Sequence, residues 1–217
     1  MHEVTVGDGR RERSRRTRRK IVTAATELFV LNGYGSTSIT AIAARADVAV
    51  QTVYATFGTK HAVLSAALDR AIAGDDAPVV VNARDWMREV FEAPTATERL
   101  TAYAGAVRRI NANAGAMFTV VATAASVDAD IVELAEATEA RRRLGARSVI
   151  DSILTVSALR SGLDAEQATD LLSLLNSPAT FEHLVQRSKW SLDDYQRWLA
   201  QTMTRELLPT ATRRART

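Results

Sequence analysis

Cysteine is absent from the 217 residues, which excludes disulfide bonds and thiolate metal sites. The three histidines, His2, His61 and His183, are scattered along the chain, so the sequence predicts no metal centre. No apolar run approaches the roughly 20 residues that span a bilayer, and the N-terminal residues lack the apolar core of a signal peptide. We therefore expect a soluble, cytoplasmic protein that has no cofactor and does not associate with membranes.

Strand signals are nearly absent as well. The only β-branched run, Val79-Val80-Val81, follows Pro78 in a segment that reads as an interdomain linker. The sequence also contains no glycine-rich phosphate loop and no obvious pair of catalytic carboxylates, so we do not expect an enzyme. After the linker, the apolar periodicity predicts helices over 85–92, 97–113, 116–127, 130–157, 165–176, 178–188 and 192–208.

Two short apolar stripes in the N-terminal region indicate a helix-turn-helix. The first stripe repeats at i, i+3, i+4 and i+7, and the second begins after only three residues, Asp47-Val48-Ala49. Two helices joined by so few residues must cross sharply, as they do when the second helix enters the major groove of DNA. The first stripe consists of Ile39, Ile42, Ala43 and Ala46, and the second of Val50, Val53, Tyr54 and Phe57.

Two more helices flank this motif. The first is predicted over 17–32, with Phe29 in the core and Gly33 as its C-terminal stop. The other is predicted from Lys60 to Ala73 and ends at Gly74.

Positive charge is concentrated at the N-terminus. Residues 1–70 contain 11 Lys or Arg against six acids, whereas the remainder contains 17 bases and 19 acids. Like-charge repulsion within the run 10–16 predicts an extended, disordered arm over residues 1–16. Such a run can be a plain solubilising tail, but directly before a helix-turn-helix it favours contact with phosphates or the minor groove. A second basic tail is expected over 209–217.

The N-terminal region resembles the DNA-binding domain of the TetR (tetracycline repressor) family of bacterial regulators over about residues 17–70. The resemblance rests on Phe29, Gly33, Tyr34, Thr37, Ile42, Ala43, Ala46, Val48, Thr52, Tyr54, Phe57, Lys60 and Leu64. The C-terminal half is similar to effector-binding domains of actinobacterial members, notably at Asn176-Ser177-Pro178, Lys189-Trp190-Ser191 and Trp198-Leu199-Ala200.

This resemblance implies an all-α chain with two domains. A three-helix DNA-binding domain with a helix-turn-helix is expected over 17–74, and a helical effector-binding and dimerisation domain over 75–208. The implied function is a ligand-responsive, nucleoid-associated transcriptional regulator. It would be a homodimeric repressor that binds a pseudo-palindromic operator in double-stranded DNA and is released by a small apolar effector. The alternative is an effector-binding or protein-docking homodimer without specific DNA reading.

Candidate DNA contacts follow from this arrangement. Contacts to base edges are expected from Thr40, Val50, Gln51 and Thr52. Contacts to phosphates are expected from Thr37, Ser38, Tyr54, Thr56, Thr59, Lys60, Arg15 and Arg16. Threonines near a helix start often serve only as caps, and the ring of Tyr54 is expected to pack inward while its hydroxyl contacts a phosphate. Lys60 opposes the dipole at its helix start, which favours a phosphate contact.

Two residues depart from the family pattern. Asp47 stands where the turn usually has glycine, and Ala49 stands where the recognition helix usually has a serine cap. A missing cap typically costs about 1 kcal/mol, so we expect the recognition helix to fray when DNA is absent.

The C-terminal sites are drawn from helices that line the family's pocket and interface. A ligand pocket is expected at Trp86, Met87, Phe91, Tyr103, Met117, Phe118 and Val121, with Arg109, Asn111 and Asn113 as polar groups on the same helices. A dimer interface is expected at Tyr195, Trp198, Leu199 and Met203. The alternative for each of these residues is an ordinary place in the core of its own domain.

Overall fold

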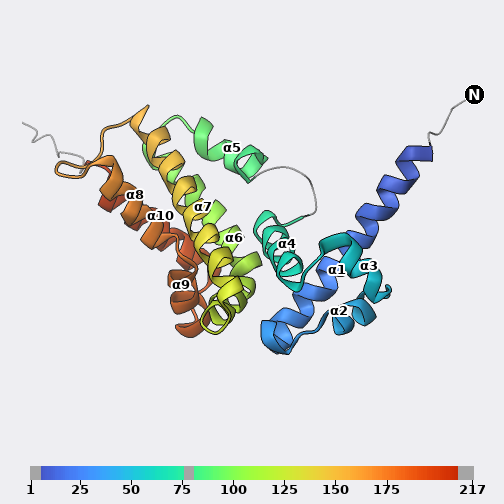
Figure 1. Cartoon of the computed structure of the whole chain (residues 1–217). Helices are drawn as coiled ribbons and strands as arrows, with labels where there is room; N and C mark the ends of the chain where they lie inside the picture. Colours follow the sequence, from blue (N-terminus) through green and yellow to red (C-terminus); the bar gives the residue numbers. More distant parts are fainter. Residues whose placement is uncertain (1–5, 76–80, 210–217) are drawn as a thin grey trace, which may run out of the picture. The chain divides into compact units, whose positions relative to one another are not determined.

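The computed structural model describes residues 6–75 and 81–209, and all regular structure in these ranges is helical. The all-α prediction is therefore confirmed. The elements are α1 Val6–Ser36, α2 Ile39–Ala46, α3 Val50–Phe57, α4 Lys60–Ala73, a 3₁₀ turn Val81–Ala83, α5 Asp85–Glu92, α6 Ala96–Ala125, α7 Ala129–Leu154, α8 Ala165–Leu175, α9 Pro178–Phe181, a π-helical turn Glu182–Arg187 and α10 Leu192–Leu207 (Figure 1). Within the described ranges, none of the helices combines the length and apolar character needed to cross a bilayer.

The chain divides into two compact units whose boundaries differ from the predicted ones. Unit 1 comprises Met1–Ala77 and Ala116–Ala135, and unit 2 comprises Pro78–Gly115 and Glu136–Thr217. The segment Ala116–Ala135 joins unit 1 because its apolar residues, among them Met117, Val121 and Ile131, are buried in the same core as the N-terminal helices. The predicted boundary at residue 75 did not place Ala116–Ala135 with the N-terminal helices. Apolar periodicity along the chain does not reveal in which core a helix buries its apolar face.

The core of unit 1 is built from the predicted stripes. All four residues of the first stripe, Ile39, Ile42, Ala43 and Ala46, are buried on α2, and Val53 is buried on α3. Phe29 of α1 and Leu64 and Leu68 of α4 complete this core and have no exposed surface. The apolar faces of α1, α2, α3 and α4 are buried in one core. This shared core holds α2 and α3 in the arrangement of a helix-turn-helix (Figure 1).

The predicted disordered arm is wrong for residues 6–16, which form the first part of α1. Arginine is a strong helix former, and the guanidinium of Arg13 donates from Nε to the carbonyl of Gly9 one turn earlier, at 3.1 Å. Residues 1–5, and residues 210–217 of the predicted basic tail, lie outside the described residues. The predicted stop at Gly33 is confirmed, because its φ of 78° and ψ of 165° interrupt the helix.

The two helices predicted over 97–113 and 116–127 form one continuous helix, α6, whose residues up to Gly115 belong to unit 2 and whose later residues belong to unit 1. Ala114 and Gly115, the two residues between the predicted helices, lie inside α6. A Cβ added to Gly115 would lie 3.6 Å from the ring of Phe181 and 3.5 Å from the amide of Gln186. Both distances are ordinary van der Waals contacts, so they show that α6 packs against the α9 region at Gly115.

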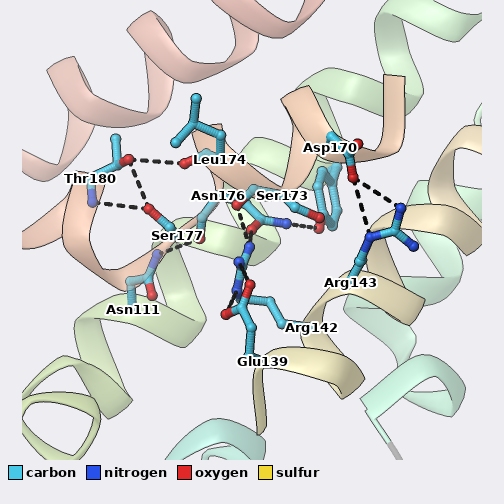
Figure 2. Close-up of polar contacts among 11 residues, drawn as sticks. Asn111, Glu139, Arg142, Arg143, Asp170, Ser173, Leu174, Asn176, Ser177 and Thr180 are labelled. Atoms are coloured by element: carbon cyan, nitrogen blue, oxygen red, sulfur yellow. Dashed lines mark hydrogen bonds and ion pairs between the residues drawn. The ribbon is translucent and has the colours of Figure 1, made fainter. Parts of the chain in front are cut away.

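A cluster of polar residues lies within the apolar core of unit 2, and Figure 2 shows its contacts. Asn176 is 4% exposed; its Nδ2 donates to the phenol oxygen of Tyr103 at 2.6 Å. Its Oδ1 accepts from Arg142, which also donates to the carbonyl of Ser173 and pairs with Glu139. The polar cluster therefore joins α6, α7 and the end of α8. Burial raises the pKa of Tyr103 to about 12, so its hydroxyl remains protonated at neutral pH.

Candidate nucleic-acid interface

The turn between α2 and α3 is closed by backbone hydrogen bonds. The amides of Asp47 and Val48 donate to the carbonyls of Ala44 and Ala43 at 3.2 and 3.0 Å. Asp47 adopts the left-handed conformation with φ 55°, which is the geometry that favours glycine. Its carboxylate lies 3.6 Å from the ammonium of Lys20, but this pair is too exposed to stabilise the turn by much.

Ala49 precedes α3 without a side-chain cap, as the sequence predicted. By contrast, the hydroxyl of Ser38 accepts from the amide of Ala41 at 3.1 Å, and that of Thr59 accepts from the amide of Ala62 at 3.0 Å. The recognition helix is therefore the element of the helix-turn-helix whose N-terminus is least satisfied.

We expect Ala49→Ser to raise the free energy of unfolding by about 1 kcal/mol, because the new hydroxyl would accept from an amide in the first turn of α3. The melting temperature followed by circular dichroism should rise by roughly 2–4 °C. Ala44→Ser is the control, because Ala44 is exposed in the interior of α2, where a serine caps nothing. Equal melting temperatures for Ala49→Ser and the parent chain would contradict the expectation.

The predicted base-contacting residues differ in exposure. Gln51 on α3 and Thr40 on α2 are exposed, and Thr52 is half-buried. Val50 is half-buried because it packs against the core of unit 1, which leaves only part of its side chain outward. Gln51 and Thr40 are therefore the predicted base contacts that the fold leaves most accessible.

Among the predicted phosphate contacts, Ser38 and Thr59 serve as helix caps. Each hydroxyl oxygen caps a helix, and each hydroxyl hydrogen is left to donate. The hydroxyl of Thr56 instead donates to the carbonyl of Thr52 at 2.7 Å. Tyr54 is 52% exposed, so the expectation that its ring packs inward is wrong; Val53 takes the inward position, and the Tyr54 hydroxyl is presented at the surface.

The predicted phosphate contact of Thr37 does not fit the structure. Its side chain is buried, and the hydroxyl donates to the carbonyls of Gly33 at 2.8 Å and Leu28 at 3.2 Å. The interruption at Gly33 leaves carbonyls at the end of α1 without helical partners. Thr37 satisfies these carbonyls, so its role is to close the end of α1.

Lys60 has an intramolecular partner that the dipole argument did not anticipate. Its ammonium donates to the carbonyl of Tyr34 at 3.0 Å and lies 4.0 Å from the centre of the Tyr34 ring. An ammonium has three hydrogens, and the contact with Tyr34 uses one of them. Tyr34 thereby holds the charge of Lys60 in a defined position beside the start of α4.

Basic side chains of α1 and α2 are exposed on unit 1. Arg15 and Arg16 are exposed, as a phosphate contact requires. Sequence reasoning missed Arg18, whose guanidinium lies 4.4 Å from the centre of the Phe57 ring, and Arg45, which pairs with Glu27 at 2.6 Å. Both contacts join residues distant in sequence, so no local spacing could have revealed them.

The predicted ligand-pocket residues are divided between the cores of the two units. Met87 and Tyr103 are buried in the core of unit 2, and Phe91 packs against it. Met117, Val121 and Phe118 belong to the core of unit 1 or pack against it, because Ala116–Ala135 is part of that unit. Trp86 alone of the seven lines a cleft of about 730 Å³ in unit 2, together with Arg109 and Asn113.

The predicted dimer residues are mostly core residues. Tyr195, Leu199 and Met203 have no exposed surface within a single chain, so the expectation that they face a partner is wrong. Trp198 is half-buried and packs against the same core. The apolar face of α10 is buried within unit 2, because it packs against α8 and the α9 region.

Comparisons with known proteins agree with this geometry. Residues 21–67, which contain the helix-turn-helix, match the model for "Bacterial regulatory proteins, tetR family". No curated protein matches the chain in sequence.

Solved structures share the fold over most of the chain. A regulator assigned to the TetR family from Rhodococcus sp. is 15% identical with a TM-score of 0.67, covering 89% of this chain and 98% of its own. A transcriptional regulator from Saccharomonospora viridis in complex with choline is 20% identical with a TM-score of 0.65, covering 88% and 96%. The multidrug binding protein EbrR complexed with imidazole is 17% identical with a TM-score of 0.58, covering 90% and 92%. The match to the tetR family model is confined to the helix-turn-helix region, and the solved structures show that most of the chain shares their fold.

Proposed function

We propose that this regulator is a homodimeric repressor that binds a pseudo-palindromic operator and leaves it when a small molecule binds unit 2. The observation that carries the proposal is the exposed leading edge of α3, where Gln51 is free to meet base edges. Ser38, Tyr54 and Thr59 present hydroxyl groups around it, and Lys60 holds a charge beside it. This is the combination of base readout and phosphate positioning that sequence-specific DNA binding requires.

Dimerisation follows from the size of the reading surface. The recognition helix has eight residues, and one such helix reads too few base pairs for useful specificity. Because three of the predicted interface residues are buried, a two-fold contact must use side chains that remain outside. Leu174 on α8 is one of these, with 65% of its surface exposed.

The proposed effector is a small organic molecule, as in the choline and imidazole complexes of the two structural neighbours. The sequence favoured an apolar compound. The cleft that contains Trp86 is lined by charged residues as well as by small apolar ones, which favours an effector that carries charge on an apolar body.

Selection from a random duplex library at moderate salt tests DNA reading. We expect the parent chain to enrich a palindrome and Gln51→Ala to relax the preference at one position in each half-site, with a loss of about 1–3 kcal/mol for the preferred base pair. Gln201→Ala, at an exposed position of α10, is the matched control and should enrich the parent sequence. Failure of the parent chain to enrich any palindrome would favour the alternative, a docking homodimer that has lost specific reading because α3 lacks its cap.

A further inference from the structure

The cleft in unit 2 is formed by α5, α6 and α10. Its volume of about 730 Å³ falls within the range of sites for small organic ligands. Small residues of α6, including Ala102, Gly105 and Ala106, lie along one side. A Cβ added to Gly105 would lie 3.4 Å from the amide nitrogen of Gln196 on α10, so the Gln196 side chain lies close to α6 at this position.

Trp86 of α5 supplies the aromatic surface of the cleft, and two charged residues lie near it. The guanidinium carbon of Arg109 lies 5.6 Å from the centre of the Trp86 ring. Glu89 follows Trp86 by three residues on α5, which places both side chains on the same side of that helix. Both Glu89 and Arg109 line the cleft.

These two charges differ from the other charges in the cleft. Arg108 pairs with Asp193 at 2.6 Å and donates to Gln196 at 2.9 Å, and Glu98 accepts from the amide and hydroxyl of Thr95. Among the described residues, neither Glu89 nor Arg109 has an ion-pair partner, and the two do not pair with each other. Glu98 has hydrogen-bond donors but no cationic partner, whereas Glu89 and Arg109 have neither hydrogen-bond nor ion-pair partners among the described residues. The cleft therefore presents one free carboxylate and one free guanidinium beside a tryptophan ring.

We propose that the cleft binds a zwitterionic small molecule, with its ammonium group on Glu89, its carboxylate on Arg109 and its apolar body against Trp86 and the small residues of α6. A guanidinium binds a carboxylate through two parallel hydrogen bonds, and Trp86 holds this one in place. A ligand with a single charge would pair with either Glu89 or Arg109 and would place a charge of the same sign near the other residue. This inference rests on the proposed function, in which unit 2 binds the effector.

Calorimetric titration of the full chain without DNA tests the proposal with benzene derivatives that differ in their charged groups. The zwitterion 4-(aminomethyl)benzoate is compared with benzylamine, which lacks the carboxylate, and benzoate, which lacks the ammonium; phenylalanine tests a shorter charge separation. We expect at least one zwitterion to bind about tenfold or more tightly than both singly charged compounds, since each adds one charge-assisted hydrogen-bonding group. If neither zwitterion binds more tightly than benzylamine and benzoate, the proposal is overturned.

Variants that remove one charge test which residue binds the ammonium end of the ligand and which binds its carboxylate end. Glu89→Gln should lower the affinity for the zwitterion and for benzylamine by about tenfold and leave the affinity for benzoate unchanged. Arg109→Gln should lower the affinity for the zwitterion and for benzoate. Glu92→Gln, at an exposed position of α5 outside the cleft, should change none of them. An equal effect of both cleft variants on all compounds would overturn the assignment. Because DNA is absent, a negative result leaves the repressor proposal intact, and failure of the duplex selection leaves this titration valid.

Discussion

Asn176→Ala should lower the free energy of unfolding by about 3 kcal/mol. The substitution removes the acceptor of a hydrogen bond from the Arg142 guanidinium and the donor to the Tyr103 hydroxyl. Hydrogen bonds to charged groups contribute about 1.5–3 kcal/mol, and a buried group left without a partner costs about 1–3 kcal/mol. For a chain of this length, the melting temperature should fall by roughly 6–12 °C.

Asn113→Ala is the matched control, because Asn113 is an exposed asparagine on α6 without a side-chain partner among the described residues. Its stability should remain within about 0.5 kcal/mol of the parent. Tyr103→Phe removes the hydroxyl that accepts from Asn176. The loss of stability in the double variant with Asn176→Ala should be smaller than the sum of the losses in the two single variants. If Asn176→Ala melts no lower than Asn113→Ala, the polar cluster does not stabilise unit 2.

The double variant Arg15→Gln/Arg16→Gln should weaken binding to every duplex, whatever its sequence. Each phosphate contact contributes about 0.9 to the slope of log K against log salt concentration, so the slope should fall by about 1.8 and the affinity by roughly 60-fold at 0.1 M salt. Glutamine has nearly the helix propensity of arginine, so α1 should remain helical. Fluorescence anisotropy over a range of salt concentrations measures both quantities.

A control with the same change in net charge is Arg197→Gln/Arg205→Gln. Both residues lie exposed on α10 and pair with Asp194 and Glu206, and exposed pairs contribute little to stability. This control should keep the parent salt slope. An equal change in both double variants would mean that net charge, rather than contact by α1, determines the affinity.

The helix-turn-helix could be predicted because its information is local. The spacing of Ile39, Ile42, Ala43 and Ala46 defines a helix with one buried face, and all four are buried. Gly33, Gly58 and Gly74 mark helix ends by conformations with positive φ that other residues rarely adopt.

The errors concern residues whose environment is set by distant segments. The apolar spacing of Tyr195, Leu199 and Met203 is the same whether the stripe faces its own core or a partner. Thr37 looked like a surface hydroxyl because its acceptors, the carbonyls of Leu28 and Gly33, become available only when α1 is interrupted. The unpaired charges of Glu89 and Arg109 come from separate helices and carry no sequence signal.

The helical state of the basic segment at the start of α1 limits how much DNA the segment can cover. Residues 6–20 as a helix span roughly 22 Å at 1.5 Å per residue, whereas the same residues in an extended arm would reach about 50 Å. At 3.4 Å per base pair along a strand, the helix spans about six base pairs and the arm would span about fifteen. In the proposed complex with an operator, the arginines would be confined to a short stretch of duplex next to the half-site, and the protected footprint of the protein on DNA should be correspondingly narrow.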